Sequence, residues 1–244
     1  FDRALNPKPL AWFLKSMFTD EPVVHLSVVE DRTEDMVWNG VQFTGDVMTG
    51  HWNREPGKAY TLYAYTNADE VELLVNGKSL GVKPNDKRNP KTRNKIKWEN
   101  VVYQPGNIQA IARTDGKVVA RYKVETAGKV AKIKLEPEAI NWKADGMDLQ
   151  HIRVTAVDSK GRQVPMENGS VSFTVSPGAE IVAVDNGDMT SHEINTLPHI
   201  QMHRGTALVV IRAGHQPGKV QLRAELNSKN VNKKIAAKCE LTLQ

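Results

Sequence analysis

The chain has 244 residues, of which 40% are hydrophobic and 25% charged, a balance typical of a folded globular protein. No apolar run approaches the roughly 18 residues that a membrane helix needs, so the sequence predicts no membrane span. The formal net charge of +5 is too small a bias to indicate a nucleic-acid partner by itself. The length allows two domains of about 100 residues each.

The opening segment, residues 1–18, is predicted to be helical after Pro7 and Pro9. Apolar residues recur in it at helical spacings, namely Leu10, Phe13, Leu14, Met17 and Phe18. This apolar face has no partner within the segment. The residue pattern leaves open whether the face packs on the domain that follows or on one that precedes it.

From Pro22 onward the pattern becomes that of short strands, beginning at residues 23–29. Asn76-Gly77 predicts a type I′ hairpin turn, because both residues tolerate the positive φ that this turn requires. The stretch from Glu30 to Gly57 is long for a sandwich loop and is expected to hold short strands and turns of its own. Further strands are expected near residues 58–66, 70–76, 79–83, 96–103, 106–114 and 117–125.

The strand pattern pauses at Thr126–Lys129 and then restarts, which predicts a domain boundary. The expected strands of the second half lie within residues 130–137, 151–165, 170–178, 179–188, 206–213, 219–226 and 235–243. Many short strands separated by turn residues are typical of immunoglobulin-like sandwiches. The prediction is therefore an all-β chain with two tandem immunoglobulin-like antiparallel β-sandwiches, one over residues 21–127 and one over 128–244.

Three phrases resemble glycoside hydrolase family 2, the family of β-galactosidases and β-glucuronidases. TNADEVELLVNGKSLG (66–81), preceded by His51-Trp52-Asn53, resembles the sandwich that follows the catalytic barrel. PKP…W…LKSMF (7–18) resembles the last helix of that (β/α)8 barrel, and VDNGDMTSHE (184–193) resembles the family's last domain. The resemblance implies that residues 1–20 are a remnant of the barrel and that the rest is a non-catalytic C-terminal region.

The same resemblance implies a retaining glycosidase as the parent, with both catalytic Glu residues upstream of this chain. No position here matches their motifs, so no catalytic residue is assigned. The upstream barrel of the same parent chain is the partner that the resemblance implies, and a periplasmic or extracellular location is the one expected for such a parent. The second half is also similar to the immunoglobulin-like repeats of bacterial adhesins, which leaves a stand-alone carbohydrate-binding or cell-surface adhesion module as the alternative.

His51, Trp52 and Asn53 are the candidate carbohydrate-binding residues, with an oligosaccharide as the ligand. An aromatic face stacks on the C–H face of a pyranose ring, while imidazole and amide groups bond hydroxyls. A tryptophan in a sandwich is more often part of the core, and that alternative stays open.

Other polar residues are interpreted as structural. Among the seven histidines, His199 and His203 would share one face of a strand, but the spacing matches no zinc motif, so no metal site and no cofactor are predicted. The basic stretch from Lys83 to Lys97 is interpreted as a solvated hairpin loop. Asn186-Gly187-Asp188 is expected to be a turn in which Asp188 bonds the local backbone, and Cys239 a half-buried strand residue.

Overall fold

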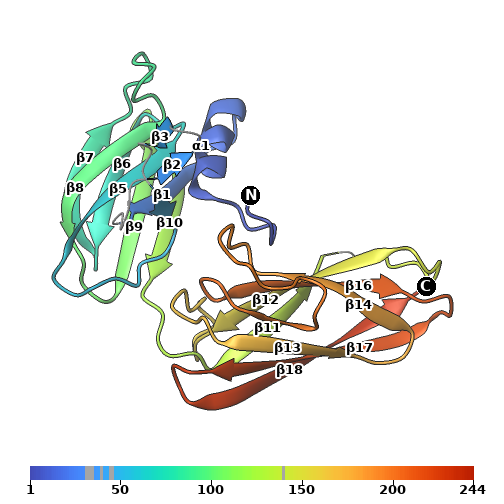
Figure 1. The fold of residues 1–244 in the computed structure, drawn as a ribbon. Helices are drawn as coiled ribbons and strands as arrows, with labels where there is room; N and C mark the ends of the chain where they lie inside the picture. The colour runs from blue at the N-terminus through green and yellow to red at the C-terminus, as the bar shows by residue number, and fades with distance from the viewer. Residues whose placement is uncertain (31–35, 39–40, 44–46, 139–140) are drawn as a thin grey trace. The chain divides into compact units, whose positions relative to one another are not determined.

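Buried and less buried side chains alternate along strands such as Glu70–Val75 and Gly218–Ser228, the pattern expected where one face of a sheet meets the core. The computed structural model describes residues 1–30, 36–38, 41–43, 47–138 and 141–244 (Figure 1). Its strands pair antiparallel throughout the named sheets, which confirms the all-β sandwich prediction. Among the described residues no helix is both long and apolar enough to cross a membrane.

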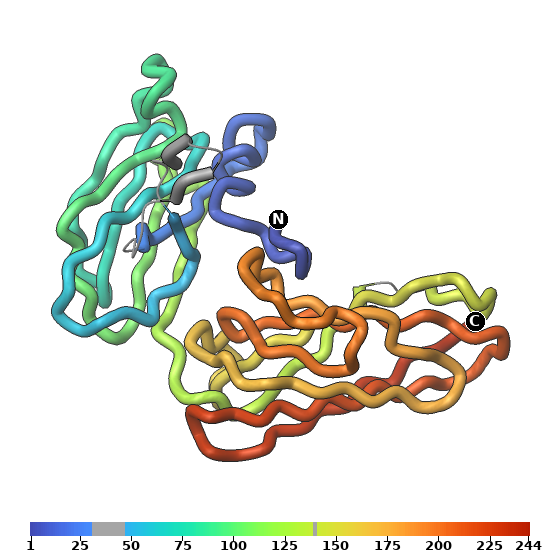
Figure 2. Tube along the Cα trace, in the orientation of Figure 1, coloured from blue at the N-terminus to red at the C-terminus, as the bar shows by residue number. Residues whose placement is uncertain are grey.

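The chain divides into two compact units. One is Pro7–Thr126, and the other is Ala127–Gln244 together with Phe1–Asn6. The trace in Figure 2 runs from the N-terminal segment into the helix, then through the first and second sets of strands. The segment 1–20, treated as one piece in the sequence analysis, is thus divided between the units.

The Pro7–Thr126 unit contains helix α1 (Pro9–Phe18) and two four-stranded sheets, in the orders β4-β1-β5-β8 and β10-β9-β6-β7. Its strands are β1 (Val24–Val29), β2 (Met36–Trp38), β3 (Val41–Phe43), β4 (Met48–Thr49), β5 (Ala59–Thr66), β6 (Glu70–Val75), β7 (Lys78–Pro84), β8 (Lys95–Val102), β9 (Asn107–Thr114) and β10 (Lys117–Glu125). Strands β2, β3 and β4 confirm that the long stretch 30–57 holds short strands. Residues 31–35, 39–40 and 44–46, with the side chains of Trp38 and Phe43, lie outside what the structure describes.

The core of this unit lies between its two sheets. Leu62 and Ala64 of β5 and Val71 and Leu73 of β6 are fully buried in one apolar cluster. Burial of each large side chain contributes about 1.5–3 kcal/mol relative to leaving it in water. The turn between β6 and β7 has positive φ at both central residues, +51° at Asn76 and +80° at Gly77, which confirms the predicted hairpin.

The second unit is a sandwich of the sheets β11-β12-β16-β14 and β15-β13-β17-β18. Its strands are β11 (Lys132–Pro137), β12 (Leu149–Val157), β13 (Ser170–Val175), β14 (Ala179–Asp185), β15 (His199–Gln201), β16 (Thr206–Ala213), β17 (Gly218–Ser228) and β18 (Lys233–Leu243). Inward-facing residues of both sheets, such as Ile152, Val209 and Leu222, form its apolar core. Cys239 lies half-buried on β18, as predicted.

Candidate functional site

Trp52, the predicted stacking platform, is part of the core of the Pro7–Thr126 unit. Its exposed fraction is 0%, and its ring meets the Tyr103 ring edge-on with centroids 5.1 Å apart. Its backbone carbonyl accepts a hydrogen bond from the Thr126 hydroxyl at 2.9 Å. Because the ring has no exposed face, it supplies no stacking surface for a sugar. Trp52 is instead a core residue, the alternative that the sequence left open.

His51 and Asn53 flank the buried tryptophan and are half-buried. The Asn53 N–H donates to His51 Nδ1 at 3.3 Å, and His51 Nε2 lies 3.8 Å from a Glu30 carboxylate oxygen. The three predicted residues are adjacent in the chain, but only these two have polar side-chain groups near the surface. Sugar binding at this position stays a prediction, now without its aromatic component.

Glu30 next to this stretch is neutralised by Arg54. Both carboxylate oxygens accept from Arg54 Nη1 at 2.7 Å, and the Arg54 side chain is almost fully buried. Burial by itself would raise the pKa of Glu30, but the hydrogen bonds from Arg54 and Thr49 outweigh it and hold the pKa below its usual value. An ionised carboxylate paired in this way is a structural ion pair, and it is not a proton donor for glycoside cleavage.

Helix α1 packs on the first sandwich through an aromatic stack. The Trp12 ring lies parallel to the His25 imidazole at 4.8 Å, and the Tyr122 ring approaches the imidazole at 4.5 Å. Asn94 Nδ2 adds a 2.7 Å hydrogen bond to the Ser16 carbonyl. Burial lowers the pKa of His25 to about 3, so this histidine is neutral near pH 7.

The opposite side of α1 is exposed among the residues that the structure describes. Leu10, Leu14 and Phe18, spaced four residues apart, are exposed, whereas Phe13 packs against Tyr65. The predicted apolar face is therefore shared between the first sandwich and solvent.

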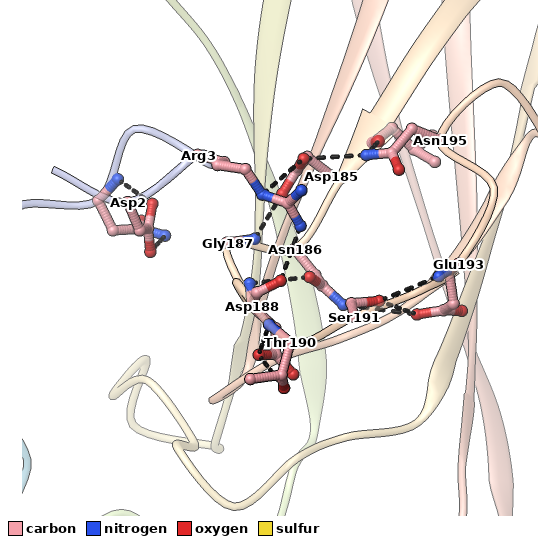
Figure 3. A network of polar contacts seen from close by, with 12 residues as sticks. Asp2, Arg3, Asp185, Asn186, Gly187, Asp188, Thr190, Ser191, Glu193 and Asn195 are labelled. Atoms are coloured by element: carbon pink, nitrogen blue, oxygen red, sulfur yellow. Dashed lines mark hydrogen bonds and ion pairs between the residues drawn. The ribbon is translucent and has the colours of Figure 1, made fainter. Parts of the chain in front are cut away.

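The loop between β14 and β15, residues 186–198, contains a network of polar contacts (Figure 3). Asn195 Nδ2 donates to Asp185 Oδ2 at 2.9 Å. The Thr190 N–H donates to Asp188 Oδ1 at 2.9 Å, which confirms the predicted bond between Asp188 and the local backbone. These contacts fix the loop from within.

The N-terminal segment joins this network, a contact that the sequence analysis missed. Arg3 Nη2 donates to the Asp188 carbonyl at 2.7 Å, and Arg3 Nε lies 3.5 Å from Asp185 Oδ2 (Figure 3). Gly187 has φ +77°, and a Cβ there would lie 2.5 Å from Asp2 Oδ2. The contact joins residues 185 positions apart, and no local pattern in the sequence signals such a pairing.

His203 and Asp188 lie beside the network, 3.6 Å apart. Burial, with the nearby Arg204, lowers the pKa of His203 despite the Asp188 charge, while the Thr190 N–H lowers the pKa of Asp188. The pair is therefore a neutral imidazole beside a carboxylate near pH 7. His199 lies on β15 and His203 beyond its end, so they do not share a strand face as considered from the sequence.

A small cavity lies on the second unit, with a volume of about 240 Å³. It is lined by Leu5, Glu136, Pro137, Glu138, His151, Arg153 and Leu208. This is below the roughly 300–1,000 Å³ of typical ligand pockets, and no Phe, Tyr or Trp ring lines it. Within the described ranges, no group of three or more His, Cys, Asp or Glu side chains is placed to hold a metal ion.

Two domain models match the chain. Residues 133–233 match the glycoside hydrolase family 2 C-terminal domain 5, and residues 57–120 match a domain of unknown function (DUF4982). The chain is 38% identical over 224 residues to the β-galactosidase BoGH2A of Bacteroides ovatus, covering 91% of this chain and 23% of that protein. It is 30% identical over 230 residues to a β-glucuronidase of Formosa agariphila, covering 92% and 20%.

Solved structures give the same result. A glycosyl hydrolase family 2 member from Bacteroides cellulosilyticus superposes with a TM-score of 0.90 at 28% identity, covering 100% of this chain and 31% of that one. A β-glycosidase from Bacteroides vulgatus gives a TM-score of 0.80 at 27% identity, covering 100% and 27%. The chain thus spans 20–23% of the length of these curated relatives and 27–31% of the length of these structures.

Proposed function

Since the chain belongs to the C-terminal β-sandwich region of glycoside hydrolase family 2, we propose that it supports the catalytic barrel of a retaining, β-galactosidase-like enzyme without carrying catalytic residues itself. The relatives that it matches are named as a β-galactosidase and a β-glucuronidase, and each is four to five times its length by coverage. A retaining mechanism requires two carboxyl groups about 5 Å apart. The carboxylates around the predicted sugar site and the loop network are instead held in ion pairs and backbone hydrogen bonds.

The exposed apolar side chains of α1 carry this proposal. Leu10, Leu14 and Phe18 form an apolar stripe on a helix that the sandwich already holds by its other side. Such a stripe marks an interaction site. A preceding barrel, of which this helix would be the last element, covers it in the simplest way.

Hydrolysis of nitrophenyl glycosides tests the division of labour. We expect the full-length parent to turn over a β-galactoside or β-glucuronide and the purified 244-residue chain to show none. Turnover by the isolated chain that survives repeated purification would overturn the non-catalytic role. A full-length parent inactive on both glycosides would argue against the proposed parent activity.

Leu14→Ser in the full-length parent tests the barrel contact. We expect it to lower the midpoint of thermal inactivation, because about 1.5–3 kcal/mol of apolar burial is lost where the stripe meets the barrel. Val82→Ser, at an exposed apolar position on β7, is the matched control and should have little effect. Equal midpoints for the two variants would leave the stripe without a role in docking.

Sugar binding by the sandwiches is the second candidate function. We expect galactosides to bind with dissociation constants in the millimolar range or weaker, a binding free energy of about 4 kcal/mol at most, because Trp52 is buried and the cavity is small. Calorimetric titration of the isolated chain measures this, with His51→Ala and Asn53→Ala as the variants. Micromolar binding lost in both variants would favour the carbohydrate-binding module.

A further inference from the structure

The loop of residues 186–198 exposes three large apolar side chains. The exposed fractions are 67% for Met189, 63% for Ile194 and 40% for Leu197. Scattered single apolar residues need no explanation, but three within nine positions of one loop do.

Hydrogen bonds hold this loop in one shape. Asn195 Nδ2 donates to the Val184 carbonyl at 2.9 Å, and the Gln201 N–H donates to Glu193 Oε1 at 3.0 Å. Together with the Thr190–Asp188 bond, these contacts anchor the loop at its start, middle and end. The apolar side chains therefore lie on an ordered loop, and their removal from water would be favourable.

The start of the chain lies against the same loop. Arg3 donates to the Asp188 carbonyl at 2.7 Å, and Asp2 closely approaches Gly187. Consecutive Cα atoms are about 3.8 Å apart, so any residues before Phe1 leave from beside the loop. Phe1 itself is 77% exposed there.

We propose that Met189, Ile194 and Leu197, together with Phe1, form a docking surface for the upstream catalytic part of the same polypeptide. The inference rests on the proposed function, which supplies that part. Because residues 2 and 3 lie against this loop, an upstream part of the same polypeptide has a higher effective concentration there than a second copy in solution. The second sandwich would then contact the catalytic part directly as well as through the first sandwich.

Hydrogen–deuterium exchange compares the loop in the isolated 244-residue chain with the loop in the full-length parent. We expect amides of residues 189–197 to exchange at least about tenfold more slowly in the parent. Equal exchange rates in both proteins would overturn the proposal, even where the parent is an active glycosidase. An inactive parent with a protected loop would contradict the proposed activity but support the docking surface.

Paired variants locate the effect in the side chains. Met189→Ser combined with Ile194→Ser should remove most of the added protection in the parent and leave the melting temperature of the isolated chain unchanged. Met147→Ser combined with Met166→Ser is the matched control, at positions 79% and 58% exposed on the same unit. A control that reduces loop protection equally would refute the assignment to this surface.

Sedimentation of the isolated chain tests the competing occupant. We expect a monomer at micromolar concentrations. A dimer abolished by the Met189→Ser, Ile194→Ser pair would assign the loop to a second copy of the chain and overturn the proposal.

Discussion

At the scale of single residues, His25 links the docking of α1 to pH. Its imidazole is buried between Trp12 and Tyr122, and Nδ1 has no hydrogen-bond partner among the described residues. Its pKa falls from an ordinary 6.5 to about 3. Between pH 6.5 and about pH 3, His25 is therefore protonated in the unfolded chain but neutral in the folded chain. The free energy of unfolding declines as the pH falls through this range.

The expected loss between pH 7 and pH 4 is on the order of 3 kcal/mol from His25. His25→Phe keeps an aromatic ring in the stack and removes the titrating group, so this variant should unfold with a flatter pH dependence over the same range. Urea unfolding monitored by tryptophan fluorescence at several pH values measures both slopes. Equal pH dependence of unfolding in the variant and in the unsubstituted 244-residue chain would contradict the role of His25.

Asp158 is a buried carboxylate whose charge is satisfied locally. Burial would raise the pKa of Asp158, but the Arg162 side chain and the backbone N–H groups of Gly128, Lys160 and Arg162 together push it far below its usual value. Such a carboxylate contributes stability above the unfolded pKa of about 3.9 and loses it as the pH falls further.

Asp158→Asn should therefore destabilise the second sandwich by about 2 kcal/mol at pH 7, because hydrogen bonds to a charged acceptor are lost. The difference in the free energy of unfolding between the variant and the unsubstituted 244-residue chain should shrink below about pH 4. Denaturant unfolding at pH 7 and pH 3 measures it. Asp86→Asn, on an exposed loop, serves as the control.

At the scale of elements, the β6–β7 hairpin depends on the positive φ of Gly77, +80°. Gly77→Ala should cost about 1 kcal/mol, since a Cβ disfavours this conformation. Gly77→Asn should cost less, because asparagine tolerates positive φ. Apart from its two chain neighbours, no atom of the described residues lies within 4 Å of the added Cβ, so a cost comes from the backbone conformation alone. Thermal unfolding of both variants gives the order, and alanine equal to asparagine would contradict it.

The hairpins could be predicted because their signals are local. Asn76 and Gly77 both have positive φ, as their residue types indicate. The assignment of Trp52 as a sugar platform depended instead on which way one side chain points, and the alternation of neighbouring strands does not determine that for a residue between β4 and β5. The ion pair between Arg3 and Asp185 could not be predicted for a different reason, because only the folded sandwich brings these distant residues together.

At the scale of the whole molecule, each unit has its own apolar core, which predicts separate folding. Fragments 7–126 and 127–244 should each show a cooperative thermal transition. The second fragment should melt below the intact chain, because it lacks the buried Ala4 and the Arg3 contacts. Thermal unfolding of each fragment, followed by circular dichroism, tests this prediction. If neither fragment showed a cooperative transition, the two units would not be independently folding domains.

The division of the second unit into Phe1–Asn6 and Ala127–Gln244 has a consequence for synthesis. Arg3 leaves the ribosome 185 residues before Asp188, the residue whose carbonyl it binds. At about 5–20 residues per second, that interval is on the order of 10–40 s. During it the helix and the first sandwich can fold, while residues 1–6 wait without their partner. Residues 1–6, which would connect any upstream domain to this unit, are thus among the last to form their native contacts. In a nascent chain stalled before residue 188, these residues would lack the contact with Asp188.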